Sequence, residues 1–252
     1  MSESEISILP SFDGLPLAVH RTGQGRPIVL LHGLFSNAEV NWIKYGTAAR
    51  LAGAGFDVIM PDLRAHGQSG HPQRVESYPA DVLVKDLVAV VSALGLADFD
   101  LCGYSLGART ALQAVAGAAV SPRRLVLCGM GLQGITNWKA RMDFFLDVIG
   151  RFGTIPREDP GWSAQHFMRS TKVDLIATRL LLESLRAGRV SDLAAVTVPT
   201  RVICGTDDED NGSAEDLAAA LPDASYATIP GTHMSSVTMP QLGDEIAAFL
   251  TA

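Results

Sequence analysis

One serine of the chain stands in a pattern that makes hydroxyl groups reactive. Ser105 is the centre of Gly103-Tyr104-Ser105-Leu106-Gly107, a G-x-S-x-G pentapeptide between an apolar run and a helical pattern. A serine on such a sharp strand-to-helix turn needs a strained backbone. The residues two before and two after it approach each other closely, which requires glycine at both. The turn lifts the hydroxyl to a helix N-terminus, where free N–H groups and the helix dipole stabilise an oxyanion. The pattern therefore predicts a nucleophilic serine.

One histidine is placed to act as the base that a serine nucleophile needs. A serine hydroxyl is weakly nucleophilic until a neighbouring group takes its proton. His233 follows the late apolar run 226–229 in a Pro-Gly turn and precedes the last helical pattern of the chain. We therefore expect it at the same edge of the sheet as Ser105, where ligands of open α/β sheets bind.

The base in turn needs a carboxylate that holds its orientation and stabilises its charged form. The acidic loop Gly205-Thr206-Asp207-Asp208-Glu209-Asp210 follows the run that ends at Cys204. The chain order serine, acid, histidine requires an acid in this region. The other natural place, residues 129–134, holds no carboxylate. We expect Asp208, three residues after the glycine, to be the acid, with Asp207 as the alternative.

A developing oxyanion needs two N–H donors aimed at it. We expect one donor to be the backbone N–H of Leu106, directly after the serine. The loop His32-Gly33-Leu34-Phe35 follows an earlier apolar run, and the N–H of Leu34 is the candidate for the second donor. His32 itself is expected to brace this loop by hydrogen bonding rather than to act as a base.

Short apolar runs alternate with helical patterns along most of the chain. Continuous apolar runs are typical of strands covered on both faces, and their alternation with helices predicts an α/β fold with a mostly parallel sheet and helices on both faces. We expect strands at 28–31, 58–60, 99–102, 125–128, 201–204 and 226–229, and helices at 84–94, 112–119 and 246–250. Residues 5–8 and 15–20 predict an antiparallel hairpin turned at Asp13-Gly14.

The alternation breaks between residues 131 and 196, where the patterns are helical. We expect an inserted helical cap at 131–196, with helices at 138–149, 164–168 and 174–185, and a core domain formed by 1–130 and 197–252. Residues 139–189 hold nine basic and six acidic side chains, against 11 and 21 in the remainder. Seven large apolar side chains fit either a substrate pocket or the cap core: Phe35, Trp138, Phe144, Phe145, Trp162, Phe167 and Met168.

Taken together, these motifs resemble those of the α/β-hydrolase superfamily. The resemblance is carried by the Leu-Leu-His-Gly segment 30–33, by 62–69 (DLRAHGQS), by the serine turn, by the Gly-x-x-Asp at 205–208 and by the Pro-Gly-x-His at 230–233. It covers nearly the whole chain, and small capped serine carboxylesterases and the 3-oxoadipate enol-lactonase type look most similar. The resemblance implies that Arg64 and His66 are structural braces. Dehalogenases and epoxide hydrolases of the superfamily use an aspartate nucleophile, and Ser105 argues against both.

Composition limits the other classes of function. The 252 residues are 47% hydrophobic and 19% charged with a mean hydropathy of +0.20, which supports a sizeable folded core. A net charge of −7 leaves no dense basic surface for a nucleic-acid partner. The longest stretch without charged side chains, 224–243, holds three Ser, three Thr and two Pro, so no membrane span is expected. The chain shows no leader pattern and has three widely spaced cysteines, so we expect a cytoplasmic protein.

The glycines at 129, 131 and 134 formally match a dinucleotide fingerprint. A helical segment follows them rather than a second strand with an acidic ribose ligand, so we expect no NAD. No Cys/His cluster predicts a metal site. The expected reaction is cofactor-free hydrolysis of a carboxylic ester through an acyl-enzyme, and the expected partner is a small-molecule ester or lactone substrate. The alternatives are an enol-lactonase or carbon–carbon bond hydrolase with the same residues, and a ligand receptor without turnover.

Overall fold

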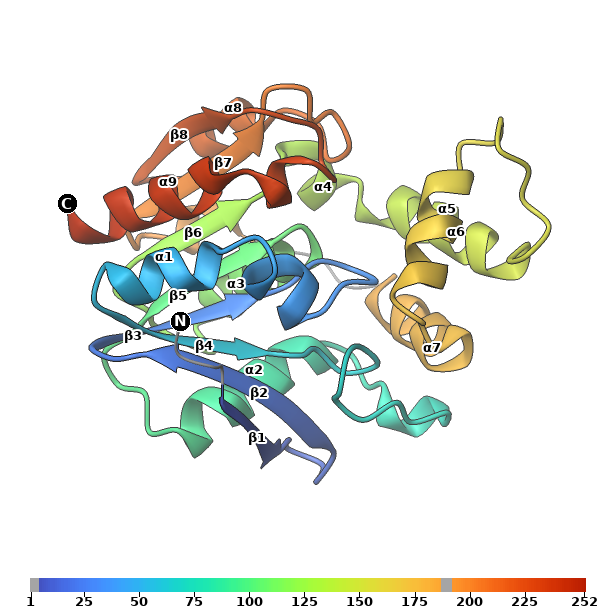
Figure 1. Ribbon diagram of the computed structural model, residues 1–252, viewed down its shortest axis with the longest axis horizontal. Coiled ribbons are helices and arrows are strands. Elements are labelled where there is room, and N and C mark those ends of the chain that lie inside the picture. The colour runs from blue at the N-terminus through green and yellow to red at the C-terminus, as the bar shows by residue number, and fades with distance from the viewer. Residues whose placement is uncertain (1–4, 187–191) are drawn as a thin grey trace.

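The protein is built on one eight-stranded sheet with the strand order β1-β2-β4-β3-β5-β6-β7-β8 (Figure 1). The computed structural model describes residues 5–186 and 192–252. The first four residues of the expected core domain and residues 187–191 of the expected cap lie outside the described residues. The strands are β1 (Glu5–Pro10), β2 (Pro16–Gly23), β3 (Arg26–Leu31), β4 (Phe56–Pro61), β5 (Asp100–Tyr104), β6 (Leu125–Cys128), β7 (Thr200–Gly205) and β8 (Ala224–Ile229).

Strand direction follows the pattern expected from the sequence. The six strands from β4 through β8 in sheet order pair in parallel, and all the predicted buried strands are among them. The first two strands form the predicted hairpin, with Glu5 opposite Arg21, and the turn uses Gly14 at a φ of 80°. β2 continues the sheet by antiparallel pairing with β4. The expected mostly parallel α/β sheet is confirmed.

Two apolar clusters cover the two faces of the sheet because side chains of a strand alternate between faces. On one face, Ile28 and Leu30 of β3 pack with α1 (Thr47–Gly53) and α9 (Pro240–Thr251). On the other face, Val29 and Leu31 pack with α2 (Val82–Ala93), α3 (Leu106–Ala116) and α8 (Ala214–Ala219). Figure 1 shows α1 and α9 in front of the sheet and α2 behind it. The doubly covered sheet holds the ends of β3, β5, β7 and β8 at one edge.

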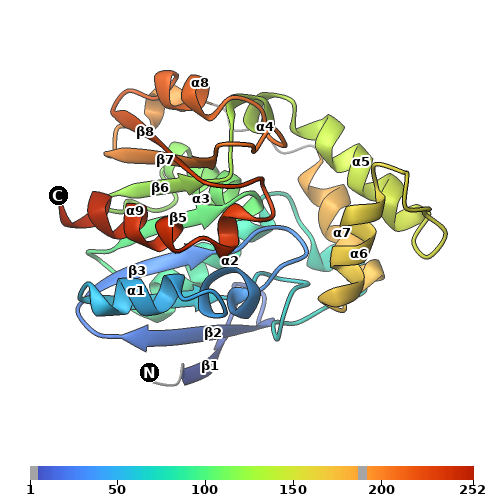
Figure 2. The same ribbon diagram turned by 45° about the horizontal axis from the view of Figure 1, so that its top comes forward.

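The segment between β6 and β7 is helical, as the sequence predicts. It contains α4 (Leu132–Thr136), α5 (Trp138–Gly150), α6 (Trp162–Ser170) and α7 (Leu175–Leu185). Asp174 caps α7 by accepting hydrogen bonds from the N–H groups of Ile176 and Ala177. Figures 1 and 2 both show α5, α6 and α7 as a separate group beyond the end of the sheet. We refer to α5–α7 as the cap helices, and the division of the chain into core and cap domains stays a prediction.

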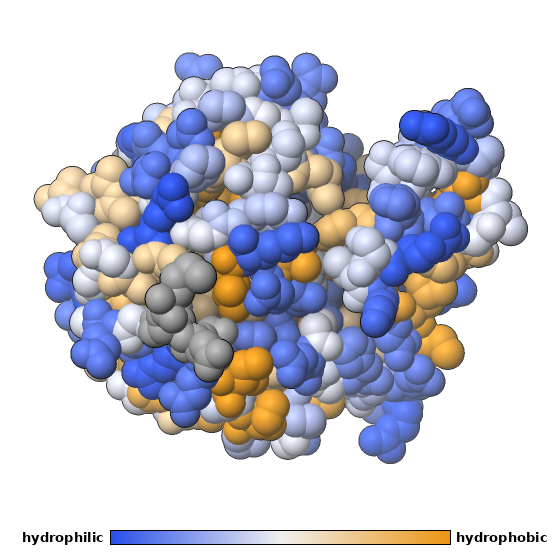
Figure 3. All heavy atoms as spheres, viewed as in Figure 1, coloured by the Kyte–Doolittle hydropathy of each residue, from blue (hydrophilic) through white to orange (hydrophobic). Residues whose placement is uncertain are grey.

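The described residues include no helix of the length and apolar content needed to cross a membrane. Figure 3 shows a largely hydrophilic surface with scattered apolar side chains, and the surface is hollowed between the main body and the lobe where Figure 1 places α5 and α6. The hollow lies toward the edge where the expected site residues follow their strands.

Candidate active site

The turn between β5 and α3 has the strained geometry that its sequence predicts. Ser105 has a φ of 52° and a ψ of −112°, outside the regions that side-chain-bearing residues favour, at a cost of roughly 1–3 kcal/mol. A Cβ added at Gly103 would lie 2.2 Å from the carbonyl carbon of Gly107. A Cβ added at Gly107 would lie 2.1 Å from the carbonyl oxygen of Leu31. Both glycines are therefore required, and the turn presents the Ser105 hydroxyl at the start of α3.

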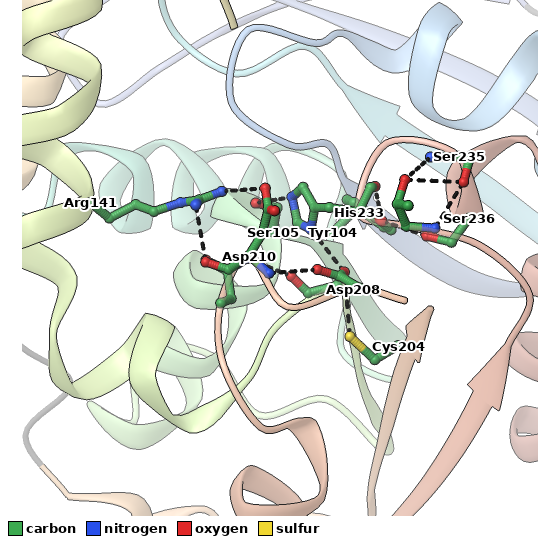
Figure 4. A network of polar contacts seen from close by, with 12 residues as sticks. Tyr104, Ser105, Arg141, Cys204, Asp208, Asp210, His233, Ser235 and Ser236 are labelled. Carbon is green, nitrogen blue, oxygen red and sulfur yellow. Dashed lines mark hydrogen bonds and ion pairs between the residues drawn. The ribbon is translucent and has the colours of Figure 1, made fainter. Parts of the chain in front are cut away.

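Three side chains from distant parts of the chain form a continuous row of hydrogen bonds (Figure 4). The distance from His233 Nε2 to Ser105 Oγ is 3.1 Å, and that from His233 Nδ1 to Asp208 Oδ2 is 2.9 Å. A carboxylate only accepts, so Nδ1 donates to Asp208 and Nε2 is left to accept the Ser105 proton. The structure thus brings together the serine, histidine and aspartate singled out in the sequence.

The Asp208 carboxylate is held in an enclosed site. Its side chain is 1% exposed, and besides His233 it accepts from the Asp210 N–H at 3.1 Å and from the Cys204 thiol at 3.4 Å. Burial acts to raise the pKa of Asp208, but these hydrogen bonds outweigh burial and leave the pKa below its usual value. Asp207, the alternative acid, is exposed and contacts the Gly231 carbonyl through its N–H. Of the two aspartates, Asp208 is therefore the one that meets the histidine.

The two candidate oxyanion donors belong to segments that lie next to Ser105. Leu106 is the first residue of α3, and Leu34 lies in the loop after β3. A Cβ added at Gly33, next to Leu34, would lie 3.5 Å from the Ser105 Cβ, so this loop runs directly against the nucleophile. Among the hydrogen bonds of the described residues, none uses the N–H of Leu34 or of Leu106. Both N–H groups are available to an acceptor.

Two buried histidines brace the loop that carries Leu34, as the sequence analysis expects. His66 Nε2 accepts from the Phe35 N–H at 3.0 Å, and His32 Nε2 accepts from the Leu63 N–H at 2.9 Å. Their Nδ1 atoms donate to the carbonyls of Arg64 and Gly33. Burial, reinforced by the neighbouring His32, lowers the pKa of His66 to about 3, so the ring stays neutral and keeps its acceptor. Phe35 is fixed by this bond at a φ of 61°.

Sequence reasoning missed two further residues that position the site. Asn41 Oδ1 accepts from the Gly33 N–H at 3.0 Å and fixes the other end of the same loop. The Tyr104 hydroxyl donates to the His233 carbonyl at 2.5 Å and lies 2.8 Å from Ser236 Oγ. Tyr104 thereby anchors the loop that carries the base (Figure 4). The sequence places Tyr104 directly before the nucleophile, and this position could have drawn attention to it. Nothing in the sequence marks Asn41.

The glycines at 129, 131 and 134 serve close packing. Gly129 has a φ of 58°, and a Cβ there would lie 2.7 Å from the Tyr104 ring. A Cβ at Gly131 would lie 2.2 Å from the Gly212 carbonyl oxygen, and one at Gly134 would lie 2.6 Å from Met130 Sδ. The match to a dinucleotide fingerprint therefore has a packing explanation in this fold.

The cap helix α5 reaches the site through two side chains. The Phe145 ring meets the Phe35 ring edge-on at 5.1 Å between centroids, and Phe144 packs on Phe145 at 5.2 Å. Arg141 donates to the carbonyl oxygen of Asp210 and to its carboxylate, each at 3.0 Å. All seven apolar side chains left open in the sequence analysis belong to the main apolar cluster or pack against it. The buried members are Phe35, Trp138 and Met168, and those packed against the cluster are Phe144, Phe145, Trp162 and Phe167.

Comparison with known proteins places this arrangement in a family. N-formylmaleamate deformylase of Pseudomonas putida is 35% identical over 129 residues, which cover 50% of this chain and 46% of that protein, so the match spans less than half of the relative. An esterase from Exiguobacterium antarcticum has the same fold with a TM-score of 0.79 at 22% identity, covering 98% of this chain and 99% of that one. The enol-lactonase from Burkholderia xenovorans gives a TM-score of 0.75 at 22% identity, over 98% of this chain and 100% of that one. The family model of the alpha/beta hydrolases matches residues 28–248, and the chain belongs to the alpha/beta hydrolase family.

Proposed function

We propose that the protein is a serine hydrolase that cleaves a carboxylic ester through an acyl-enzyme. One observation carries the proposal, which is the unbroken row from Asp208 Oδ2 through the His233 ring to Ser105 Oγ, with distances of 2.9 and 3.1 Å. The hydrogen bonds of this row run in the order and direction needed for a nucleophile, its base and the acid that orients the base. The nucleophile is half-buried rather than enclosed, so a substrate carbonyl can reach its hydroxyl.

The first half of the reaction forms the acyl-enzyme. Ser105 Oγ attacks the ester carbonyl carbon while its proton passes to His233 Nε2. The imidazolium is stabilised by Asp208, which accepts from Nδ1 throughout and stays ionised. As the tetrahedral intermediate collapses, the carbon–oxygen bond to the alcohol breaks and His233 gives the proton to the leaving oxygen.

The second half repeats these steps with water. Water gives a proton to His233 Nε2 and attacks the acyl carbon. The proton then returns to Ser105 Oγ as the acid leaves. In both halves the negative charge on the former carbonyl oxygen is stabilised by hydrogen bonds from the N–H groups of Leu34 and Leu106. These N–H groups have no other acceptor among the described residues. Loss of one such donor typically costs about 10²–10³ in rate.

Lactones are the second substrate class. Hydrolysis of a lactone uses the same steps, except that the leaving alcohol stays attached to the acyl group. The likeness of this fold to the Burkholderia xenovorans enol-lactonase and the basic excess of residues 139–189 favour including anionic lactones. A carbon–carbon bond hydrolase would use the same three residues, whereas a receptor would bind its ligand without turnover.

The experiment is steady-state kinetics on nitrophenyl esters of increasing acyl length and on neutral and anionic lactones, with Ser105→Ala as the test variant. Ser163→Ala, an exposed serine on α6, is the matched control. We expect turnover by the wild-type protein and by Ser163→Ala, and none by Ser105→Ala with an unchanged melting temperature. Turnover that survives in Ser105→Ala, or ligand binding without turnover in the wild-type protein, contradicts the proposal.

A further inference from the structure

Among the described residues, the hydrogen bonds between the loop that carries the candidate acid and the cap helices all involve Asp210. Asp210 donates its N–H to Asp208 Oδ1 at 3.1 Å. Its carbonyl oxygen and its carboxylate both accept from the Arg141 guanidinium, each at 3.0 Å. Three polar groups of Asp210 are thus used, one toward the acid and two toward α5. Figure 4 shows Arg141 reaching from its helix across to this loop.

The same stretch of α5 also contacts the opposite side of the site. The Arg141 guanidinium lies 5.1 Å from the centre of the Phe145 ring. Phe145 in turn meets Phe35, the neighbour of Leu34, edge-on at 5.1 Å. Helix α5 therefore contacts both the loop of the acid, through Arg141, and the loop of the oxyanion donor, through Phe145.

We propose that Arg141 is a positioning residue, which holds Asp208 in its working orientation by fixing the backbone of Asp210. The inference rests on the proposed serine hydrolase function. The guanidinium donates to both the carbonyl oxygen and the carboxylate of Asp210, so it constrains the position of the residue whose N–H meets Asp208. Misplacement of a catalytic group by about 1 Å can cost about 100-fold in rate.

The Arg141–Asp210 ion pair is partly exposed to solvent, so a positioning role and a stabilising role predict different effects on the melting temperature. The side chains of Arg141 and Asp210 are 22% and 49% exposed. Ion pairs this exposed to solvent contribute little to the free energy of unfolding. Breaking the pair should therefore leave the melting temperature nearly unchanged while it releases Asp210, whose N–H is one of the donors that hold Asp208. A purely structural contact would show the reverse.

The chain offers a matched control for cap contacts in general. Gln73, in the loop between β4 and α2, donates to the Asp174 carboxylate at the start of α7, with a distance of 2.9 Å. This hydrogen bond also joins the core to the cap helices, but it touches neither the Asp208 loop nor the Leu34 loop. Gln73→Ala therefore removes a core-to-cap contact without freeing the acid.

The experiment measures the rate constant for covalent labelling by a fluorophosphonate, together with kcat and KM for a nitrophenyl ester, in Arg141→Met, Arg141→Lys, Asp210→Asn and Gln73→Ala. Labelling reports how reactive Ser105 is and needs no particular ester pocket. We expect Arg141→Met and Asp210→Asn to lower both the labelling rate and kcat by about tenfold, within the loss that such misplacement causes. Arg141→Lys keeps the charge but loses the paired donation to the carbonyl and carboxylate of Asp210. Its labelling rate and kcat should lie between those of Arg141→Met and the wild-type protein.

Two further results complete the test. The double variant Arg141→Met/Asp210→Asn should be no slower than either single variant, because both changes break one interaction. Gln73→Ala should match the wild-type protein. A rise in KM with unchanged labelling would make Arg141 a substrate contact and overturn the proposal, as would an equal loss in Gln73→Ala. A wild-type protein that neither labels nor turns over would instead refute the proposed function.

Discussion

Two groups of histidines near the same sheet edge show how different surroundings give one residue type different roles. His32 and His66 use both ring nitrogens on backbone groups, N–H on one side and C=O on the other. His233 has a carboxylate on one nitrogen and a half-buried hydroxyl on the other. The first two rings have no position left for a reactant. The third is the only one of these three whose accepting nitrogen meets a group that can react.

The group that the accepting nitrogen contacts therefore distinguishes a structural histidine, such as His66, from the candidate base His233. Burial alone does not make this distinction, because His233 is 8% exposed and His66 is 2% exposed. The two groups are nevertheless linked, since the His66 ring fixes Phe35 directly after the oxyanion candidate Leu34. Variants of each histidine should therefore differ in kind, one changing the rate alone and the other changing stability and rate together.

The largest effect is expected for the histidine with the reactive contact. His233→Ala removes the base, and kcat should fall by about 10⁴–10⁶, as is typical when the base of such a triad is lost. Its melting temperature should stay close to that of the wild-type protein. The measurement pairs ester kinetics with thermal unfolding. A loss of less than about tenfold in kcat would remove His233 from the chemistry.

The next effect concerns the acid that orients His233. Asp208→Asn should lower kcat by about 10²–10⁴, because an amide no longer fixes the Nδ1–H tautomer. The neighbouring exposed Asp207→Asn is the matched control and should differ from the wild-type protein by less than about twofold, as expected of an exposed side chain outside the row. The same ester assay measures both. Equal losses in the two variants would show that the acidic loop matters through its overall charge.

A smaller effect on rate, joined to a loss of stability, is expected for the bracing group. His66→Ala leaves the Phe35 N–H without its acceptor and opens a cavity, at a cost of about 2–4 kcal/mol in the free energy of unfolding. The rate should fall by about tenfold or less through displacement of Leu34. Urea unfolding and ester kinetics measure the two effects, with the half-buried His71→Ala as the control. Unchanged stability would refute the bracing role.

The smallest effect is expected in the pH dependence of the free energy of unfolding. Burial lowers the pKa of His66 to about 3, whereas an unfolded histidine titrates near pH 6.5. Between these values the unfolded chain binds a proton that the folded protein does not. The free energy of unfolding should therefore fall with decreasing pH by up to about 1.4 kcal/mol per pH unit from this group. The lowered pKa of Asp208 acts in the same direction, because its stabilising contribution is lost as the carboxylate is protonated.

The slope can be assigned by substitution. His66→Gln should flatten the acid limb of the stability profile, measured by urea unfolding at a series of pH values. His166→Gln, an exposed position on α6, should leave the profile unchanged. An identical slope in the wild-type protein and in His66→Gln would show that other groups carry it.

Features fixed within a few residues could be predicted from the sequence more fully than contacts between distant segments. The Ser105 turn could be predicted because its constraint lies within five residues, and Gly103 and Gly107 are forced by contacts that a Cβ would break. Strands such as β3, β4 and β6 were evident because each contains a continuous apolar run. The short helices α1 and α8 were not predicted, although Ser213 accepts from the Asp216 N–H as a helix cap and a Ser-x-x-Asp pattern could have signalled α8.

Contacts between distant segments that no motif marks were the part that the sequence did not reveal. Asn41 meets the Gly33 N–H only because the segment after β3 turns back on itself, and no local pattern encodes that bond. Arg141 and Asp210 lie 69 positions apart and depend on where the cap helices pack. The basic excess of residues 139–189 is visible in the sequence, but only the structure pairs one of these cations with the loop of the acid.

The most direct measurement is the identification of the residue that becomes covalently modified. The protein is treated with a fluorophosphonate, digested, and the labelled peptide sequenced by mass spectrometry, with Ser105→Ala and His233→Ala treated in parallel. We expect one adduct on Ser105, none in Ser105→Ala, and labelling slowed by orders of magnitude in His233→Ala. Ester hydrolysis with the adduct on another residue, or labelling of Ser105 at an undiminished rate without His233, would contradict the central claim.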